Sequence, residues 1–435
     1  MLVVETATAL KKAGHHVEVF TSFHDPKRAF TETTDGTLDV HVHDSIIPRS
    51  IFGRFLNPLA IMRFFWTTAK VMMRHKNLAG GYDIIFVDQI STTIPLLKYS
   101  GSKVVYYCHF PDLLLSSRKS CIKRIYRIPI DFLEEITTAQ ADVILVNSQF
   151  TLKIFHNTFK SIHKSPTVLY PTVHAERISL SSSLRASPTQ SSSSSTSPSS
   201  LSTSSSVSTA PPMSRNSGGL SGSKGVVIVP ERFQDLVGTR FLLSLNRFER
   251  KKNHGLAIDA LVLVLQAMDE KEKEKLRLVI AGGYDERVAE NVQHLQELKQ
   301  HAQKAGVSQF VKFYTKLPDL ERNWLLWNSK IVLYTPENEH FGIVPLEAGA
   351  ALRPVIACNS GGPLESIVDG VTGYHCPSDP AAWADKMLIL LRNEAMAKQF
   401  GENAVKRVVN NFSPNVIIPQ LETILYDINL QRKRR

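Results

Sequence analysis

Short apolar runs alternate with amphipathic stretches along most of this chain. In the first half, the runs at 83–87, 103–107 and 142–146 have the length and the β-branched and aromatic content of buried strands. In the second half, comparable runs occur at 240–245, 278–283, 311–314, 331–334 and 354–357. Strands that alternate with helices predict a parallel sheet covered by helices, and the pattern occurs in both halves. The sequence therefore predicts an α/β protein with two Rossmann-like domains that face each other across a cleft.

The start of the chain departs from this alternation. Residues 3–12 predict a helix that Gly14 ends, and residues 16–21 predict a strand. A doubly wound domain normally begins with a strand and a glycine-rich turn ahead of its first helix, and the sequence shows neither. We therefore expect an N-terminal domain that lacks its first strand and Gly-rich loop. An inactive truncated product is one alternative that this leaves open.

Serine dominates the chain between its two halves, from about residue 179 to about residue 225. No apolar period survives in this stretch, so it cannot bury a core and is predicted to be disordered. The predicted organisation is an N-terminal domain at 1–173, a linker at 174–235, a C-terminal domain at 236–413 and a helix at 414–435 that returns to the first domain.

Two carboxylates follow the apolar run at 331–334. Glu339 is predicted on a loop at the carboxyl end of this strand, and Glu347 lies eight positions further on. Pro345 predicts the first turn of a helix that contains Glu347, since a proline there loses no hydrogen bond. Free N–H groups at the start of such a helix suit phosphate oxygens. Carboxylates for hydroxyl groups and amides for phosphate predict a nucleotide-sugar site. The alternative is a pair of solvated surface charges.

Two cations, Arg247 and Lys252, follow the apolar run at 240–245. When a sugar leaves its nucleotide, negative charge grows on the diphosphate, and two fixed cations could stabilise that charge without a metal ion. The chain contains no Asp-X-Asp pair, so we expect a metal-independent reaction and assign no metal site. Arg250 and Lys251 are interpreted as basic surface residues, which is also the alternative for the other two cations.

His109 follows the run at 103–107, at a strand end that should face the cleft. We expect it to contact the sugar, with a purely structural histidine as the alternative. No nucleophile stands out in the sequence. This favours front-face attack, in which the leaving phosphate takes the proton of the acceptor, over a covalent sugar–enzyme intermediate.

Two stretches, from Arg49 to Lys76 and from Arg118 to Arg127, contain cations and no acid among large apolar side chains, in a chain of net charge +11. Such stretches can lie in the interface of a membrane with anionic lipids, and the first is too interrupted by charge to span one. The alternative is a pair of basic helices packed on the domain. Nucleic acid is not expected as a partner, since no binding motif accompanies the charge. Four scattered cysteines predict reduced thiols in the cytosol.

The E-x7-E pattern with its trailing Gly-Gly resembles the donor site of retaining glycosyltransferases of the GT-B fold. In that family the first glutamate contacts the sugar hydroxyls, the second holds the ribose, and the amides between them meet the diphosphate. The family also has an Arg and a Lys at the spacing found here, usually followed by Gly, where this chain has Asn253. The resemblance implies catalytic roles for His109, Arg247, Lys252 and Glu339, and donor binding by Phe341, Gly342, Ile343, Val344, Glu347, Gly361 and Gly362.

The runs at 106–115, 146–151 and 281–287, together with the block at 339–365, resemble the eukaryotic mannosyltransferases of dolichol-linked oligosaccharide assembly. This resemblance implies GDP-mannose as donor, no cofactor, and a mannosyl-chitobiosyl pyrophosphoryl dolichol as acceptor. The implied products are an α-1,3 and then an α-1,6 linkage, made on the cytosolic face of the endoplasmic reticulum membrane. Other transferases of that pathway are candidate partners.

The same resemblance assigns the acceptor pyrophosphate to the second basic stretch and the acceptor lipid to Leu113, Leu114 and Leu115. The cations assigned to the acceptor and the membrane are Arg118, Lys119, Lys123, Arg124 and Arg127. A GT-B transferase with another nucleotide-sugar and a soluble acceptor is the alternative. It predicts no membrane association.

Overall fold

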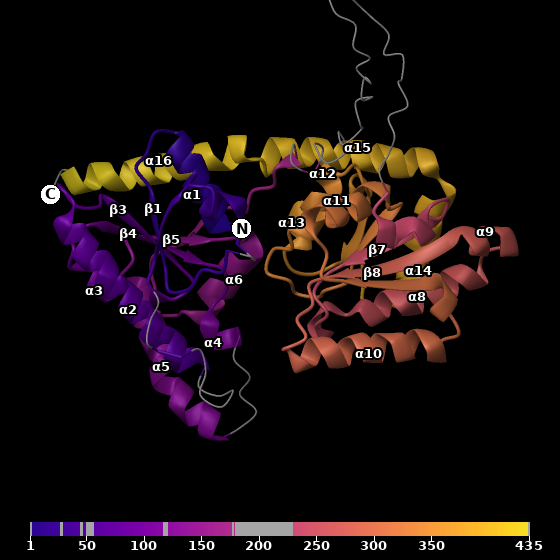
Figure 1. Ribbon diagram of the computed structural model, residues 1–435, viewed down its shortest axis with the longest axis horizontal. Coiled ribbons are helices and arrows are strands. Elements are labelled where there is room, and N and C mark those ends of the chain that lie inside the picture. Colours follow the sequence, from indigo (N-terminus) through magenta and orange to yellow (C-terminus); the bar gives the residue numbers. More distant parts are fainter. Residues whose placement is uncertain are drawn as a thin grey trace, which may run out of the picture.

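The structure is a computed structural model that describes residues 2–26, 29–43, 47–48, 56–115, 121–175, 178 and 229–433. It contains two α/β domains that stand side by side, and two successive helices run along the top, α15 (Glu394–Asn411) over the C-terminal domain and α16 (Pro414–Lys433) over the N-terminal domain (Figure 1). The serine-dominated stretch lies outside the described residues. The architecture confirms the predicted fold class of two parallel-sheet domains.

The N-terminal domain has two sheets, each made of parallel strands. A four-stranded sheet has the order β3-β4-β5-β6, and β1 pairs with β2 in a two-stranded sheet. The strands are β1 (Glu18–Thr21), β2 (Asp39–Val42), β3 (Ile84–Asp88), β4 (Lys103–Cys108), β5 (Val143–Val146) and β6 (Thr167–Val168). Among the described residues no ladder joins the two sheets.

Helices cover both faces of the four-stranded sheet. They are α1 (Leu2–Lys12), α2 (Leu56–Asn77), α3 (Ile94–Lys98), α4 (Asp112–Leu115), α5 (Cys121–Ala139) and α6 (Gln149–Thr158). Alternate residues of β4 enter different cores, since successive strand side chains point to opposite faces. Tyr106 packs with α3 and α6, whereas Tyr107 packs with the C-terminal helix α16 (Pro414–Lys433) through Ile417 and Leu421. The helix predicted at 414–435 therefore packs on the N-terminal domain.

The C-terminal domain contains a six-stranded parallel sheet of order β12-β11-β10-β7-β8-β9. Its strands are β7 (Arg240–Leu245), β8 (Leu276–Gly282), β9 (Val311–Thr315), β10 (Ile331–Tyr334), β11 (Val355–Cys358) and β12 (Gly373–Cys376). Its helices are α8 (His254–Gln266), α9 (Glu270–Lys275), α10 (Ala289–Lys304), α11 (Asp319–Asn328), α12 (Val344–Ala350), α13 (Pro363–Ser366), α14 (Pro380–Arg392) and α15 (Glu394–Asn411). The strand order reverses between β7 and β10, and ligands of such sheets bind at the carboxyl ends of the strands beside that point.

Candidate functional site

The loops after β7 and β10 meet at the point where the strand order reverses. Lys252 ends a short 3-10 segment after β7, and its ammonium forms an ion pair with the Glu339 carboxylate on the loop after β10. Both side chains are largely withdrawn from water, with exposed fractions of 8% for Lys252 and 20% for Glu339. The hydroxyl of Thr335 donates to the backbone carbonyl of Lys252 at 2.7 Å, which ties the two loops together. The structure thus joins two of the predicted catalytic residues.

The charge state of this pair follows from its surroundings. Burial by itself would raise the pKa of Glu339, but the Lys252 ammonium outweighs burial and holds that pKa below its ordinary value. Glu339 is therefore ionised at neutral pH. An ionised carboxylate can accept hydrogen bonds from sugar hydroxyls, which is the role predicted for it.

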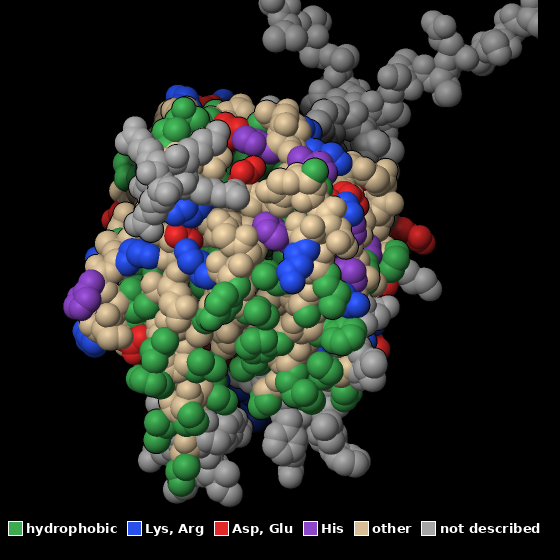
Figure 2. All heavy atoms as spheres, turned by 90° about the vertical axis from the view of Figure 1, so that its left-hand side faces the viewer, with side chains coloured by type: hydrophobic (Ala, Val, Ile, Leu, Met, Phe, Trp, Pro, Cys, Tyr) green, Lys and Arg blue, Asp and Glu red, His purple; other side chains and the backbone are tan. Residues whose placement is uncertain are grey.

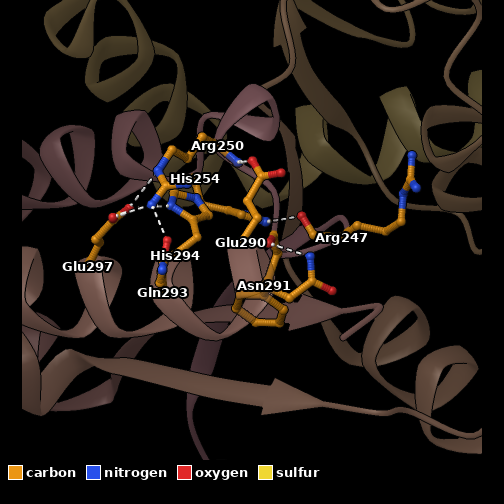
Figure 3. A network of polar contacts seen from close by, with 9 residues as sticks. Arg247, Arg250, His254, Glu290, Asn291, Gln293, His294 and Glu297 are labelled. Atoms are coloured by element: carbon orange, nitrogen blue, oxygen red, sulfur yellow. Dashed lines mark hydrogen bonds and ion pairs between the residues drawn. The ribbon is translucent and has the colours of Figure 1, made fainter. Parts of the chain in front are cut away.

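Arg247 occupies a different place from Lys252. Its side chain is 61% exposed and pairs with Glu249 at 2.8 Å, so it stands at the rim of the site. Arg250 extends away from Arg247 and reaches α10, where its Nε donates to Glu297 at 3.1 Å (Figure 3). Arg250 therefore anchors the loop to the domain. Asn253 adopts the left-handed conformation with φ +49°, which asparagine tolerates better than most residues and glycine adopts without strain.

The loop that contains Arg247 is also held from below by buried polar groups. Asn291 donates from Nδ2 to the carbonyl of Phe248 at 3.0 Å, and His254 contacts the carbonyl of Arg247 through Nε2 at 3.3 Å (Figure 3). Because a carbonyl only accepts, Nε2 of His254 is the protonated nitrogen, and Nδ1 accepts from Ser244 at 2.9 Å. Burial lowers the pKa of His254 to about 3, so this histidine stays neutral. Sequence reasoning missed both supports.

Glu347 lies on α12, as predicted, and is buried. Its carboxylate forms an ion pair with Arg322 of α11. The sequence did not predict a role for Arg322, because it is one of several charged residues on an amphipathic helix. Ile343 and Val344 lie at the start of α12, with Gly342 in the preceding loop.

The Gly-Gly pair permits a close approach of two loops. The N–H of Gly362 donates to the carbonyl of Glu339 at 2.8 Å. A methyl group on Gly361 would lie 2.5 Å from that same carbonyl oxygen, and one on Gly362 would lie 2.2 Å from the Cα of Phe341. The pair thus supports the Glu339 loop from behind. The Phe341 side chain is buried and packs against the ring of Tyr170 with centroids 5.6 Å apart.

His109 follows β4 in the other domain, and its Nε2 lies 2.7 Å from a carboxylate oxygen of Asp88 at the end of β3. Asp88 was not predicted; it ends a neighbouring parallel strand, and carboxyl ends of such strands meet at one edge of the sheet. The next residue, Phe110, stacks on His340 of the Glu339 loop with ring centroids 3.7 Å apart and an interplanar angle of 4°. The loop after β4, which contains His109 and Phe110, is therefore in contact with the loop after β10, which contains Glu339 and His340. We call the second of these the glutamate loop.

Of the five cations predicted to contact the acceptor or the membrane, only Arg127 has a described side chain. Arg118 and Lys119 lie outside the described residues, as do the side chains of Lys123 and Arg124 on α5. The Arg127 side chain is 1% exposed and forms an ion pair with Asp131 at 2.8 Å. On a helix, residues four apart share a face, and this pair lies on the face of α5 turned toward the domain. The role predicted for Arg127 toward the acceptor or the membrane stays a prediction.

Beside Arg127, Glu134 of α5 accepts the backbone N–H of Asp112 at 2.7 Å and that of Leu113 at 2.9 Å. Burial raises the pKa of Glu134 to about 7. This buried carboxyl, which the sequence reasoning missed, fixes α4 directly behind the His109 loop.

One group of possible metal ligands is present among the described residues, away from the loops above. Atoms of Glu18, Asp39 and His41 lie within 4.8 Å of one another on β1 and β2. The Glu18 carboxylate is occupied by Arg74 at 2.8 Å, a cation that competes with any metal ion.

The sequence matches the family described as "Glycosyl transferases group 1" over residues 231–407 and that described as "Glycosyltransferase Family 4" over residues 1–177. It is 40% identical to "Alpha-1,3/1,6-mannosyltransferase ALG2" of Dictyostelium discoideum, over 98% of this chain and 94% of that protein. The protein of the same name from Homo sapiens is 39% identical over 97% of this chain and 90% of its own length. The one from Saccharomyces cerevisiae is 33% identical over 97% and 80%.

Solved structures share the fold. A glycosyltransferase from Rickettsia africae superimposes with a TM-score of 0.67 at 17% identity, covering 98% of this chain and 93% of its own. Anabaena HepE in complex with UDP gives a TM-score of 0.66 at 16% identity, with coverage of 98% and 95%. At these identities the likeness concerns the fold, which is that of the GT-B glycosyltransferases.

Proposed function

The chain belongs to the family of the alpha-1,3/1,6-mannosyltransferases, and we propose that it transfers mannose from GDP-mannose to a mannosyl-chitobiosyl pyrophosphoryl dolichol. The linkages are α-1,3 and then α-1,6, formed with retention and without a metal ion, in the assembly of the N-glycan precursor. The observation that supports this most is the buried Lys252–Glu339 pair, which lies at the carboxyl ends of β7 and β10 and faces the His109 loop.

In the proposed mechanism each charged group has one task. Glu339, kept ionised by Lys252, accepts hydrogen bonds from the mannose hydroxyls and orients the sugar. Lys252, and Arg247 at the rim, stabilise the negative charge that grows on the GDP diphosphate as the glycosidic bond breaks. A diphosphate oxygen takes the proton of the attacking acceptor hydroxyl on the same face, so the new bond keeps the configuration of the old one. Glu347 holds the ribose, and His109, oriented by Asp88, contacts the sugar from the first domain.

The acceptor lipid suggests where a membrane would lie. The described helices include none long and apolar enough to cross a membrane. However, α5 exposes large apolar side chains at the spacing of one helical face. The neighbouring helix α2 also exposes large apolar side chains. They are Ile125, Ile128, Phe132, Leu133 and Ile136 on α5, and Met62, Phe65, Trp66 and Met73 on α2.

Figure 2 views the molecule from the left-hand side of Figure 1. It shows hydrophobic side chains gathered over the lower part of that side, where Figure 1 places α2 and α5. We define this set of nine side chains as the apolar face. We propose that it rests on the cytosolic surface of the endoplasmic reticulum membrane, with the cations of the basic stretches near anionic headgroups. This placement would bring the lipid-borne acceptor to the cleft without a membrane span.

The function is tested by incubating the chain with a mannosyl-chitobiosyl pyrophosphate on a short lipid, GDP-mannose and EDTA. We expect one and then two added mannoses, and no product from Glu339→Gln. The matched control is Glu337→Gln, an exposed carboxylate on the same loop, which should retain activity. A requirement for divalent metal would refute the metal-independent mechanism. Transfer from a different nucleotide-sugar alone would refute the donor, and no transfer would support the truncated-product alternative.

Membrane contact distinguishes the lipid acceptor from a soluble one. The double variant Ile128→Asp/Phe132→Asp should reduce flotation of the chain with vesicles that contain anionic lipid. Tyr426→Asp is the matched control, because Tyr426 is 65% exposed on α16, which runs along the top of the N-terminal domain in Figure 1, whereas α5 lies at its bottom. Equal flotation of both variants would favour the soluble-acceptor alternative.

A further inference from the structure

The start of α6, in the N-terminal domain, contacts two loops of the C-terminal domain. Ser148 is the N-cap of this helix, where its oxygen accepts the N–H of Thr151 at 2.9 Å. The same hydroxyl, fully buried, donates to the carbonyl of His340 at 2.6 Å. One capping residue therefore serves its own helix and also fixes the residue next to Glu339.

Glu365 completes this contact from the other domain. Its two carboxylate oxygens accept the N–H groups of Gln149 and Phe150, each at 2.8 Å, and the hydroxyl of Tyr170 donates to it at 3.0 Å. The first N–H groups of a helix have no partner within the helix, and the helix dipole favours a negative charge beside them. Burial, with the neighbouring carboxylate, raises the pKa of Tyr170 to about 12, so its hydroxyl stays a donor.

Within its own domain Glu365 is rigidly joined to the candidate donor site. The Arg407 Nε donates to the carbonyl of Ser366 at 3.0 Å, which fixes the short helix α13. At the other end of the same segment, Gly362 donates to the carbonyl of Glu339 at 2.8 Å. A continuous set of hydrogen bonds thus runs from α6 through Glu365 and Gly362 to the glutamate loop.

We propose that Glu365 is a positioning residue that couples closure of the two domains to the conformation of the Glu339 loop. In the closed arrangement α6 supports this loop twice, through Ser148 to the carbonyl of His340 and through Glu365 to the segment behind Glu339. When the domains separate, both supports are lost, and the loop loses its fixed position. Glu365 acts through Glu339 and does not touch the sugar, and this consequence for catalysis rests on the proposed function.

The test compares Glu365→Gln and Ser148→Ala with a matched control, Glu135→Gln. A glutamine amide cannot accept both N–H groups of α6, because one of its two ends is itself a donor. Glu135 likewise accepts a backbone N–H, that of Ser161 at 2.8 Å, but both residues belong to the N-terminal domain. The control therefore removes a comparable bond that does not connect the domains.

The first readout is the distance between domains, measured by pulsed electron resonance between spin labels at exposed positions 160 and 299. The cysteines 108, 358 and 376 are buried, and Cys121→Ser removes the fourth. We expect Glu365→Gln and Ser148→Ala to lengthen and broaden the distance distribution, while Glu135→Gln leaves it as in the unmodified chain. Unchanged distances in both variants would overturn the proposal.

The second readout separates positioning from folding. We expect turnover of Glu365→Gln to fall by roughly tenfold to hundredfold, the scale of a charge-assisted hydrogen bond, with GDP affinity unchanged. Equal loss of GDP binding, turnover and thermal stability with normal distances would indicate a merely structural role and overturn the proposal. If Glu365→Gln does not fold, Tyr170→Phe removes one bond to the carboxylate without changing charge and should broaden the distances less. The distance measurement needs no substrate. If the chain does not use GDP-mannose but the Glu365→Gln variant still shows longer interdomain distances, the donor assignment is refuted and the role of Glu365 in joining the domains is not.

Discussion

Replacing Lys252 by methionine should leave the Glu339 carboxylate buried without its partner. The side chain of Glu339 is 20% exposed, so little water can replace the lost ammonium. Breaking a buried ion pair from one side costs about 3–5 kcal/mol, and because Glu339 keeps some exposure we expect the lower end of that range, about 3 kcal/mol. The double variant Lys252→Met/Glu339→Gln removes both charges. It should recover at least ~1 kcal/mol relative to the sum of the single variants.

The dependence of this loss on pH follows from the pKa of Glu339. With Lys252 present that pKa is lowered, so the pair stabilises the fold above the unfolded pKa and loses this effect as the pH falls. Without Lys252 the largest remaining influence on the pKa of Glu339 is burial, which raises it. The folded variant then takes up a proton more readily than the unfolded chain, so its deficit should shrink on acidification and grow toward neutral pH.

Urea unfolding of the four proteins in the cycle, at pH 5 and pH 7.5, measures these quantities. The control is Lys251→Met, whose side chain is 66% exposed and should contribute little. Additive effects of the two single changes, within ~0.5 kcal/mol at both pH values, would refute the conclusion that this is a coupled buried pair.

Three further outcomes are expected. Arg247→Ala should lower turnover by about 2–4 kcal/mol of transition-state stabilisation without changing the melting temperature, because the side chain is exposed; a change in KM alone would contradict its assigned role. Burial lowers the pKa of His340 from 6.5 to about 4, so stability should fall by up to ~3 kcal/mol as the pH drops from 6.5 to 4, and urea unfolding of His340→Phe should lack this change. Gly361→Ala should destabilise the chain more than Gly370→Ala in thermal unfolding: both have positive φ, but only at Gly361 would the methyl group meet a backbone atom, and equal losses would show that the close approach is relieved.

The local pattern of the chain was enough to predict its strands and the residues that follow them. Apolar runs of β-branched and aromatic residues became β3, β4 and β7 with nearly the predicted bounds. Because parallel strands present their carboxyl ends to one edge, the positions of Glu339 and Lys252 in loops after two such strands could also be anticipated. These features depend on residues close together in the sequence.

The partners of those residues could not be predicted in the same way. Arg322 faces Glu347, and Asp88 faces His109, only because separate elements pack side by side. The run of cations at 118–127 gave no sign that the Arg127 side chain is buried and paired with Asp131. Which face of α5 is buried is decided by the elements beneath it, and these are distant in the sequence.

By itself, the sequence determined the two α/β domains and the residue types at the strand ends, since both follow from periodicity and local backbone geometry. Only the tertiary structure decided which charges meet, and above all that Glu365 lies on the first N–H groups of α6, 216 positions away from Gln149. A hydrogen bond needs its two atoms within about 3 Å. Over such a separation in the chain, that proximity is created by the packing of the two domains and by no local pattern.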